Sequence, residues 1–162
     1  MQIIRTDTQP RLGPLLAAAL SLPAALILAT ALLLAPRFVH AEQLLQTTTT
    51  WEGGDIAYPG GDAEVTSIIL KIDEGQEAPF HCHPVPTLGY VLKGTVDVET
   101  LDGKTRRITQ GESVVEVLRT VHRGRSVGGP VEILVFYAGA TDIPNTVLPA
   151  NDPDHEYCNP AR

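Results

Sequence analysis

The stretch that decides the fold covers residues 75–94 and reads GQEAPFHCHPVPTLGYVLKG. At its centre, one residue, Cys82, separates His81 from His83. Side chains of an extended segment alternate between its two faces, so we expect both imidazoles on one face and the thiol on the other. Imidazole is a common ligand of transition metals in proteins. The stretch therefore predicts half of a metal site, which His122 completes from a returning strand.

The chain around this stretch consists of short segments with the pattern of β-strands. Apolar and β-branched residues recur between turn residues, and Asp102-Gly103 predicts a tight two-residue hairpin. No window after residue 41 shows sustained helical periodicity. We therefore predict an all-β fold, either a sandwich or a barrel. The expected strands are 65–72, 89–92, 95–101, 104–109, 113–118 and 131–138.

The first 41 residues have the pattern of a signal peptide. Arg5 and Arg11 precede an apolar run over residues 15–35, and Ala41 ends a segment that suits signal peptidase. We expect cleavage after Ala41, with no membrane span left in the mature chain. The alternative is an uncleaved membrane anchor, because the run is long enough to span a bilayer. Cleavage predicts a periplasmic or secreted protein.

Charge and length limit what the exported chain can do. The full chain has 12 basic and 19 acidic residues and a net charge of −7; removal of residues 1–41 takes away three arginines and one aspartate, which leaves −9. Such an acidic protein is a poor partner for nucleic acid. The remaining residues suffice for one domain. We assign 42–64 to an N-terminal arm, 65–140 to the barrel, and 141–162 to a C-terminal arm or tail.

The order of glycines and histidines resembles the two conserved motifs of the cupin superfamily. Gly75, His81, His83, Thr87 and Gly94 have the spacing of the first motif; Gly111 and His122, with ten residues between them, have the spacing of the second. The resemblance implies a double-stranded β-helix (jelly-roll barrel) that commonly forms homodimers. It also implies that His81, His83 and His122 bind one divalent transition metal ion, and Fe, Mn, Cu, Ni and Zn all accept imidazole ligands.

The sequence departs from the family pattern at a residue that matters for chemistry. Thr87 stands where the family usually has a glutamate ligand, and a neutral hydroxyl is a poor ligand for a divalent ion. Glu116 lies on a neighbouring predicted strand, but nothing in the spacing requires it at the site. We predict that Thr87 and Val91, which share one face of their strand, contact the bound ligand. No catalytic residue can be assigned.

Two functions fit these residues. The first is a metal-dependent dioxygenase-like oxidoreductase that acts on a small, oxygen-rich chelating compound, as the resemblance to quercetin dioxygenase-like cupins implies. The second is a non-catalytic cupin that binds a metal or a small ligand, which the missing glutamate favours. An isomerase or lyase would need a base that the sequence does not identify.

Three further expectations concern residues outside the motifs. Tyr90 and Phe136 are expected in the barrel core, with an interface as the alternative for Tyr90. Trp51 is expected against the barrel exterior or a partner subunit. Cys82 can pack in the interior or form a disulfide with Cys158, and the sequence does not decide between these roles.

Overall fold

The computed structural model describes residues 39–160, which lie almost entirely within the compact unit Glu42–Arg162. The predicted signal peptide, residues 1–41, falls outside the described residues except for its last three positions. Within residues 39–160, no helix has the length and apolar character needed to cross a membrane.

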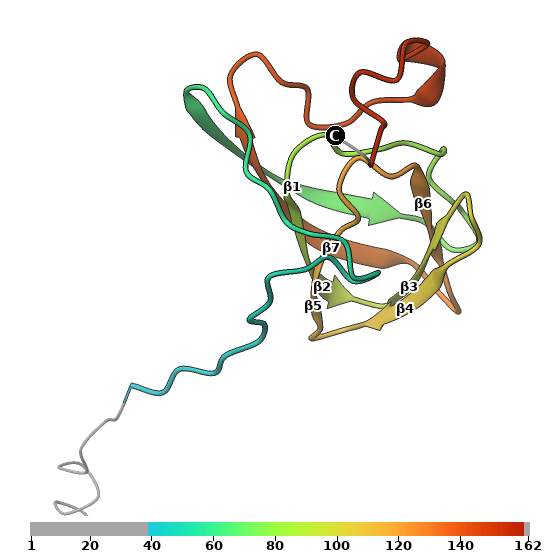
Figure 1. Cartoon of the computed structure of the whole chain (residues 1–162). Helices are drawn as coiled ribbons and strands as arrows, with labels where there is room; N and C mark the ends of the chain where they lie inside the picture. Colours follow the sequence, from blue (N-terminus) through green and yellow to red (C-terminus); the bar gives the residue numbers. More distant parts are fainter. Residues whose placement is uncertain (1–38, 161–162) are drawn as a thin grey trace, which may run out of the picture. The chain divides into compact units, whose positions relative to one another are not determined.

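Two antiparallel sheets face each other in this unit (Figure 1). One sheet has the order β1 (Ala63–Ile72), β7 (Val131–Ala140), β2 (Thr87–Lys93) and β5 (Ser113–Val115). The other has the order β4 (Thr105–Thr109), β3 (Thr95–Thr100) and β6 (His122–Ser126). In the described part of the chain, the 3₁₀ turn Pro149–Asn151 (η1) is the only helical element. The all-β prediction is confirmed.

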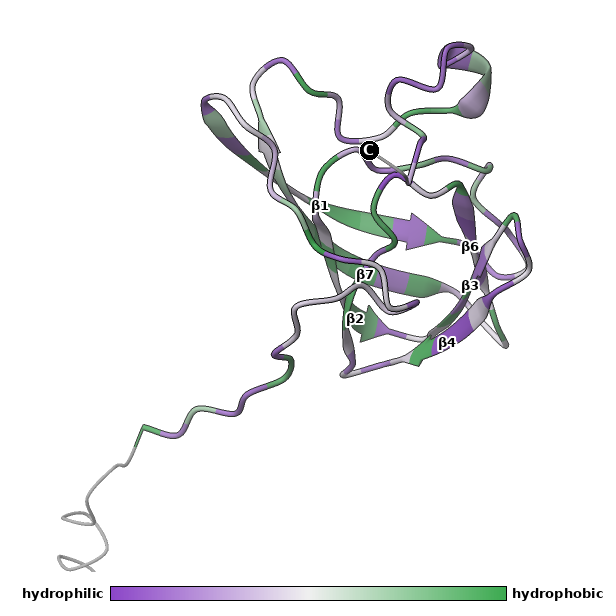
Figure 2. Cartoon of the chain, viewed as in Figure 1, coloured by the Kyte–Doolittle hydropathy of each residue, from purple (hydrophilic) through white to green (hydrophobic). Residues whose placement is uncertain are grey.

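Alternation along the strands places the hydrophobic core between the two sheets. On β3, Val96 and Val98 are buried while their neighbours are partly exposed, and on β7 the buried Val135 and Tyr137 flank the exposed Phe136. Hydrophobic residues dominate β1, β2 and β7, whereas β4 and β6 are mostly hydrophilic (Figure 2). The largest buried cluster consists of Ile72, Val91, Val96, Val98, Ile108, Val114 and Val131.

The strand register gives the barrel two distinct ends. At one end, which we call the histidine end, β2 begins at Thr87 and β6 begins at His122. Tyr137, near the end of β7, pairs with Thr87 there. At the other, which we call the aliphatic end, Val91 and Val131 pack in the buried cluster. The same strands run through both ends, so the position of a residue along its strand determines at which end its side chain lies.

Tight turns close the aliphatic end and the β3–β4 hairpin. Gly94 joins β2 to β3 with a φ of 81°, and a Cβ there would lie 2.4 Å from the carbonyl oxygen of Pro130. This close approach requires glycine. Gly103 occupies the β3–β4 turn with a φ of 86°. A hairpin forms where Asp102-Gly103 predicted one, but Thr100 lies opposite Lys104, so the loop covers residues 101–103 and is one residue longer than expected.

Two sequence-based expectations need correction. A returning strand was expected to carry His122, but the range of β6 was not among the expected strands, because its charged side chains and Gly124 hide any apolar alternation. Phe136 does not lie in the core: it is 42 % exposed on the outer face of β7, opposite Leu88 of β2. Its neighbours Val135 and Tyr137 take the inward positions, and alternation turns Phe136 outward.

Both arms pack against the barrel. In the N-terminal arm, the backbone N–H of Trp51 donates to the carbonyl of Val115, and the indole packs against the buried valine cluster. In the C-terminal arm, Val147 and Cys82 exchange two backbone hydrogen bonds of 2.9 and 3.0 Å. Part of the segment after residue 140 is therefore held on the histidine end.

Candidate metal centre

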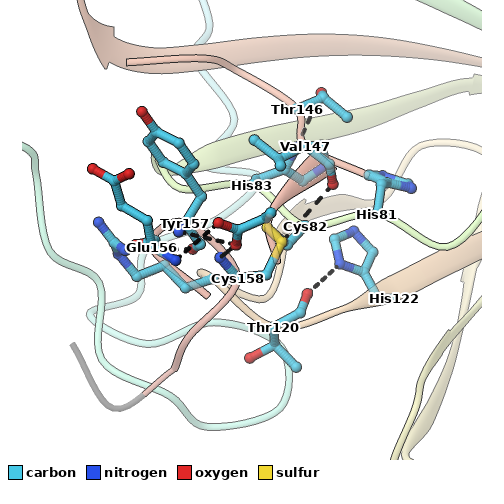
Figure 3. Close-up of a disulfide and its surroundings, with 12 residues drawn as sticks. His81, Cys82, His83, Thr120, His122, Thr146, Val147, Glu156, Tyr157 and Cys158 are labelled. Atoms are coloured by element: carbon cyan, nitrogen blue, oxygen red, sulfur yellow. Dashed lines mark hydrogen bonds between the residues drawn. A yellow bond between two sulfur atoms is a disulfide. The ribbon is translucent and has the colours of Figure 1, made fainter. Parts of the chain in front are cut away.

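The segment that carries the first two histidines is extended but belongs to no regular strand. Isolated bridges hold it from different sides: His81 pairs with His122, Cys82 with Val147, and His83 with Leu118. The N–H of His81 donates to the carbonyl of His122 at 2.9 Å, and the N–H of His122 donates back at 2.8 Å. The predicted alternation is present, with the imidazoles on one side and Cys82 on the other (Figure 3).

Each of the three imidazoles is oriented by a backbone carbonyl. Nδ1 lies 2.8 Å from the oxygen of Pro79 in His81, of Asn145 in His83, and of Thr120 in His122. A carbonyl oxygen can only accept, so each Nδ1 carries the proton and each Nε2 presents a lone pair. A ligating histidine usually has its second nitrogen held in this way.

The structure brings the three rings together at the histidine end. Their ring centroids are 4.8 Å apart for His81 and His83, 4.6 Å for His81 and His122, and 5.0 Å for His83 and His122. One nitrogen from each ring can be chosen such that all three lie within 4.8 Å of one another. Three nitrogens gathered in this way could hold a single metal ion.

Burial keeps these imidazoles in the neutral form that binds metal. Desolvation lowers the pKa of His81, and the neighbouring His122 lowers it further. Desolvation lowers the pKa of His83 well below its usual value, and His122 and His81 add to the effect. Desolvation also lowers the pKa of His122. Three neutral imidazoles therefore converge without any competing proton at neutral pH.

A cavity of about 240 Å³ opens beside the three rings, between the two sheets. Its walls are mostly aliphatic or aromatic, with Leu70 from β1, Val98 from β3, and Ile133 and Tyr137 from β7. Polar groups gather at one end, where the imidazoles, Thr87 and Glu116 lie. An apolar chamber with a few converging polar groups is the usual form of a small-molecule site.

The two residues predicted to contact a ligand lie at different depths. Thr87 is buried and lines the cavity, and its hydroxyl donates to the carbonyl of Val85 at 3.1 Å. Val91 lies on the same face of β2, but four residues farther along, a distance of about 13 Å. It packs in the valine cluster of the aliphatic end and does not line the cavity.

Glu116 was not assigned to the site from the sequence, yet the structure places it there. It lines the cavity, and its Oε2 lies 3.6 Å from Nε2 of His122. Desolvation raises the pKa of this carboxyl, while His81 and the indole N–H of Trp51 act to lower it. Glu116 could have been assigned to the site only from the strand register between residues 87–92 and 113–118. Local sequence patterns do not determine that register.

The C-terminal arm is the second part of the site that the sequence left open. Cys82 and Cys158 form a disulfide, so the thiol that points away from the imidazoles ties the arm to the ligand-bearing segment (Figure 3). The arm supplies the carbonyl of Asn145 to His83 and contributes Thr146 and Leu148 to the cavity wall. It forms part of the wall of the site.

A buried carboxylate stabilises the end of this arm. The carboxylate of Asp152 accepts hydrogen bonds from the backbone N–H groups of Glu156, Tyr157 and Cys158, at 2.8 to 3.1 Å. Arg119 donates to the carbonyls of Glu156 and Tyr157 from the connection before β6. The cysteine that forms the disulfide is therefore held from both sides.

The donor set fits a divalent transition metal. Three imidazoles with free Nε2 atoms suit Fe, Mn, Cu, Ni or Zn, and the carboxylate of Glu116 lies 3.6 Å from Nε2 of His122. The arrangement does not select one of these metals.

Comparison with known proteins gives a family-model match to part of the chain and several partial structural similarities. Residues 68–137 match the family model described as Cupin domain. No curated protein matches the chain. The DMSP lyase DddQ from Ruegeria pomeroyi DSS-3 is similar over 54 % of this chain and 44 % of its own, with 23 % identity and a TM-score of 0.47. The chain thus spans less than half the length of that lyase.

Two other solved structures are similar to a comparable extent. Oxalate decarboxylase from Lactobacillus farciminis, solved as a formate complex, is 19 % identical over 51 % of this chain and 26 % of its own, with a TM-score of 0.45. A cupin-like protein from Thermotoga maritima is 15 % identical over 54 % of this chain and 65 % of its own, with a TM-score of 0.44.

Proposed function

The chain contains a cupin domain, and from this premise we propose that it is a metal-dependent, dioxygenase-like oxidoreductase for a small chelating compound. The observation that carries the proposal is the orientation of the three imidazoles. Each Nδ1 is occupied by a backbone carbonyl, and the three rings meet at one end of a largely apolar cavity. Such an arrangement presents Nε2 lone pairs to an ion and leaves room beside it for a ligand.

A bound divalent metal would supply Lewis acidity toward substrate oxygens and a place for dioxygen to react. His81, His83 and His122 would hold it. Because all three ligands are neutral, the charge of the ion is not offset by them, which favours an anionic substrate with two adjacent oxygens. The walls formed by Leu70, Ile133 and other apolar residues would exclude water from the bound compound.

The cavity size narrows the class of substrate. Its volume of about 240 Å³ lies below the range of roughly 300–1,000 Å³ that is common for drug-sized ligands. A catechol or a β-diketone suits this volume better than a three-ring flavonol does. We therefore propose a substrate with one ring or none, bound through two neighbouring oxygens.

Oxygen uptake is the direct test of the enzymatic proposal. The purified protein, loaded in turn with Fe²⁺, Mn²⁺, Cu²⁺ or Ni²⁺, should consume oxygen with at least one catechol or β-diketone and less with flavonols. His122→Ala should abolish this uptake. His155→Asn is the matched control, because His155 lies in the C-terminal arm with a positive φ that Asn tolerates. A metal-loaded protein that consumes no oxygen with any of these compounds would be a non-catalytic cupin.

We also propose that the protein is exported and works in the periplasm or outside the cell. The disulfide between Cys82 and Cys158 supports this location, since such bonds persist in oxidising compartments. Mass spectrometry of the protein from its native cells should give a chain that begins at Glu42. A chain that retains residues 1–41 would favour the membrane-anchor alternative.

A homodimer is the proposed assembly. The outer face of the β1-β7-β2 part of the sheet carries Val65, Ile69, Leu88 and Phe136, each 38–72 % exposed. An exposed apolar stripe of this kind is typical of a subunit interface. Light scattering should give twice the chain mass, and Phe136→Glu should reduce it to the mass of one chain. A wild-type protein with the mass of one chain at micromolar concentration would contradict this assembly.

A further inference from the structure

The residue that occupies the usual glutamate position has a carboxylate directly across from it. In the β2–β5 ladder, Leu88 pairs with Val115. The next pair toward the histidine end is Thr87 and Glu116, because the N–H of Glu116 donates to the carbonyl of Thr87 at 2.8 Å. Residues directly opposite each other in an antiparallel pair project from the same face, with Cβ atoms about 5 Å apart. A carboxylate is therefore present at this face, one strand away from the expected position.

The carboxylate of Glu116 lies beside the imidazole of His122, and the indole N–H of Trp51 also acts on it. Its Oε2 is buried, lies 3.6 Å from Nε2 of His122, and forms no hydrogen bond with the described residues. The indole nitrogen of Trp51, held nearby by the backbone bond to Val115, is also buried without a hydrogen bond. A buried carboxylate without a partner is costly, so native structures rarely keep one unless something binds it.

The distance between the two atoms fits two ligands of one ion better than a direct contact. At 3.6 Å, Glu116 Oε2 and His122 Nε2 are too far apart for a hydrogen bond. Two atoms that each lie about 2.1 Å from the same ion are roughly 3–4 Å apart. Thr87 is a poorer ligand than Glu116, because its neutral hydroxyl, which donates to the carbonyl of Val85, carries no charge to offset that of the ion.

We propose that Glu116 is the fourth protein ligand of the metal, in place of the residue at position 87. This inference rests on the metal-binding part of the proposed function. It gives the site three imidazoles and one carboxylate, with the carboxylate moved from β2 to the residue that follows β5. The charge of the ion is then partly offset inside the cavity, and Trp51 becomes a positioning residue for the carboxylate.

Co²⁺ titration of the metal-free protein tests the assignment through binding and colour, without any assay of activity. Wild-type protein should bind one Co²⁺ per chain, and its visible absorption should report the ligand set. Glu116→Gln keeps the size of the side chain and removes the charge; it should weaken Co²⁺ binding by roughly 10-fold to 100-fold and change the visible spectrum. Glu132→Gln is the matched control, because its partly exposed carboxylate lies away from the cavity, pairs with Lys71 at 3.7 Å and carries the same charge.

A swap across the ladder separates ligation from a general effect of charge or folding. In the double variant Glu116→Gln, Thr87→Glu, the carboxylate returns to the opposite strand and should recover tight Co²⁺ binding and a wild-type-like spectrum. Equal affinity and identical spectra for the wild type and Glu116→Gln would overturn the assignment of Glu116 alone. A wild-type protein that binds no Co²⁺ would overturn the metal site itself, and with it the proposed function.

Discussion

The two ends of the barrel are built from the same strands but for different purposes. At the aliphatic end, inward positions hold valines and isoleucines, and short turns such as the one at Gly94 close the structure. At the histidine end, inward positions hold His122, Thr87 and Tyr137, and long irregular segments close the structure. The difference indicates that the aliphatic end supplies stability and the histidine end supplies binding.

Removal of the disulfide should have the largest effect on stability, and it acts at the histidine end. Cys82 and Cys158 are 76 residues apart, so their bond restricts the unfolded chain strongly. The double variant Cys82→Ser, Cys158→Ser should lose about 4 kcal/mol of unfolding free energy in urea denaturation. It should also bind metal more weakly, because the arm that carries Asn145 would no longer be tied to the segment beside His83.

A dithiol reductant offers a check on that result. Wild-type protein treated with dithiothreitol should approach the double variant in both unfolding free energy and metal affinity. Unchanged metal affinity after verified reduction would mean that hydrogen bonds alone hold the arm in place. The disulfide would then have no role in metal binding at the histidine end.

Loss of one imidazole should affect binding far more than folding. His83→Ala should lower metal affinity at least about 100-fold, or about 2.8 kcal/mol of binding free energy. Circular dichroism should show the same β content as the wild type. His155→Asn should bind metal like the wild type, and a similar loss in both variants would contradict the assignment.

Substitution at the aliphatic end should show the reverse pattern. Val91 is 1 % exposed within the valine cluster, so Val91→Ala should cost about 2 kcal/mol of unfolding free energy. Its metal stoichiometry and affinity should equal those of the wild type, as measured by titration below the unfolding midpoint. Weaker metal binding without loss of stability would show that Val91 reaches the site, as the sequence suggested.

The smallest expected effect is the pH dependence of the metal-free protein. The pKa values of His81, His83 and His122 are lowered by burial, so the unfolded state takes up protons first as pH falls below about 6.5. Unfolding free energy should be highest above that pH and should decline below it. The decline should be shallower in His83→Ala, since fewer buried imidazoles remain. If unfolding free energy declined equally steeply with falling pH in both proteins, the interpretation that the buried imidazoles are neutral would be contradicted.

The sequence predicted the parts of the site that depend on local spacing. Alternation placed His81 and His83 on one face and Cys82 on the other, and the glycine spacing identified the barrel family. It could not predict Glu116, because the β2–β5 register arises from long-range pairing. The position of the C-terminal arm depends on Cys158, which is far from Cys82 in the chain. Val91 lies in the valine cluster, four residues along β2 from Thr87, because alternation says nothing about position along the barrel axis.

Metal content is the measurement that tests the central claim most directly. Protein expressed in medium with Fe, Mn, Co, Ni, Cu and Zn, then purified without chelators, should contain close to one transition-metal ion per chain by inductively coupled plasma mass spectrometry. His83→Ala should contain almost none, and His155→Asn should match the wild type. A wild-type protein that holds no metal, and takes up none when the ions are added back, would contradict the account.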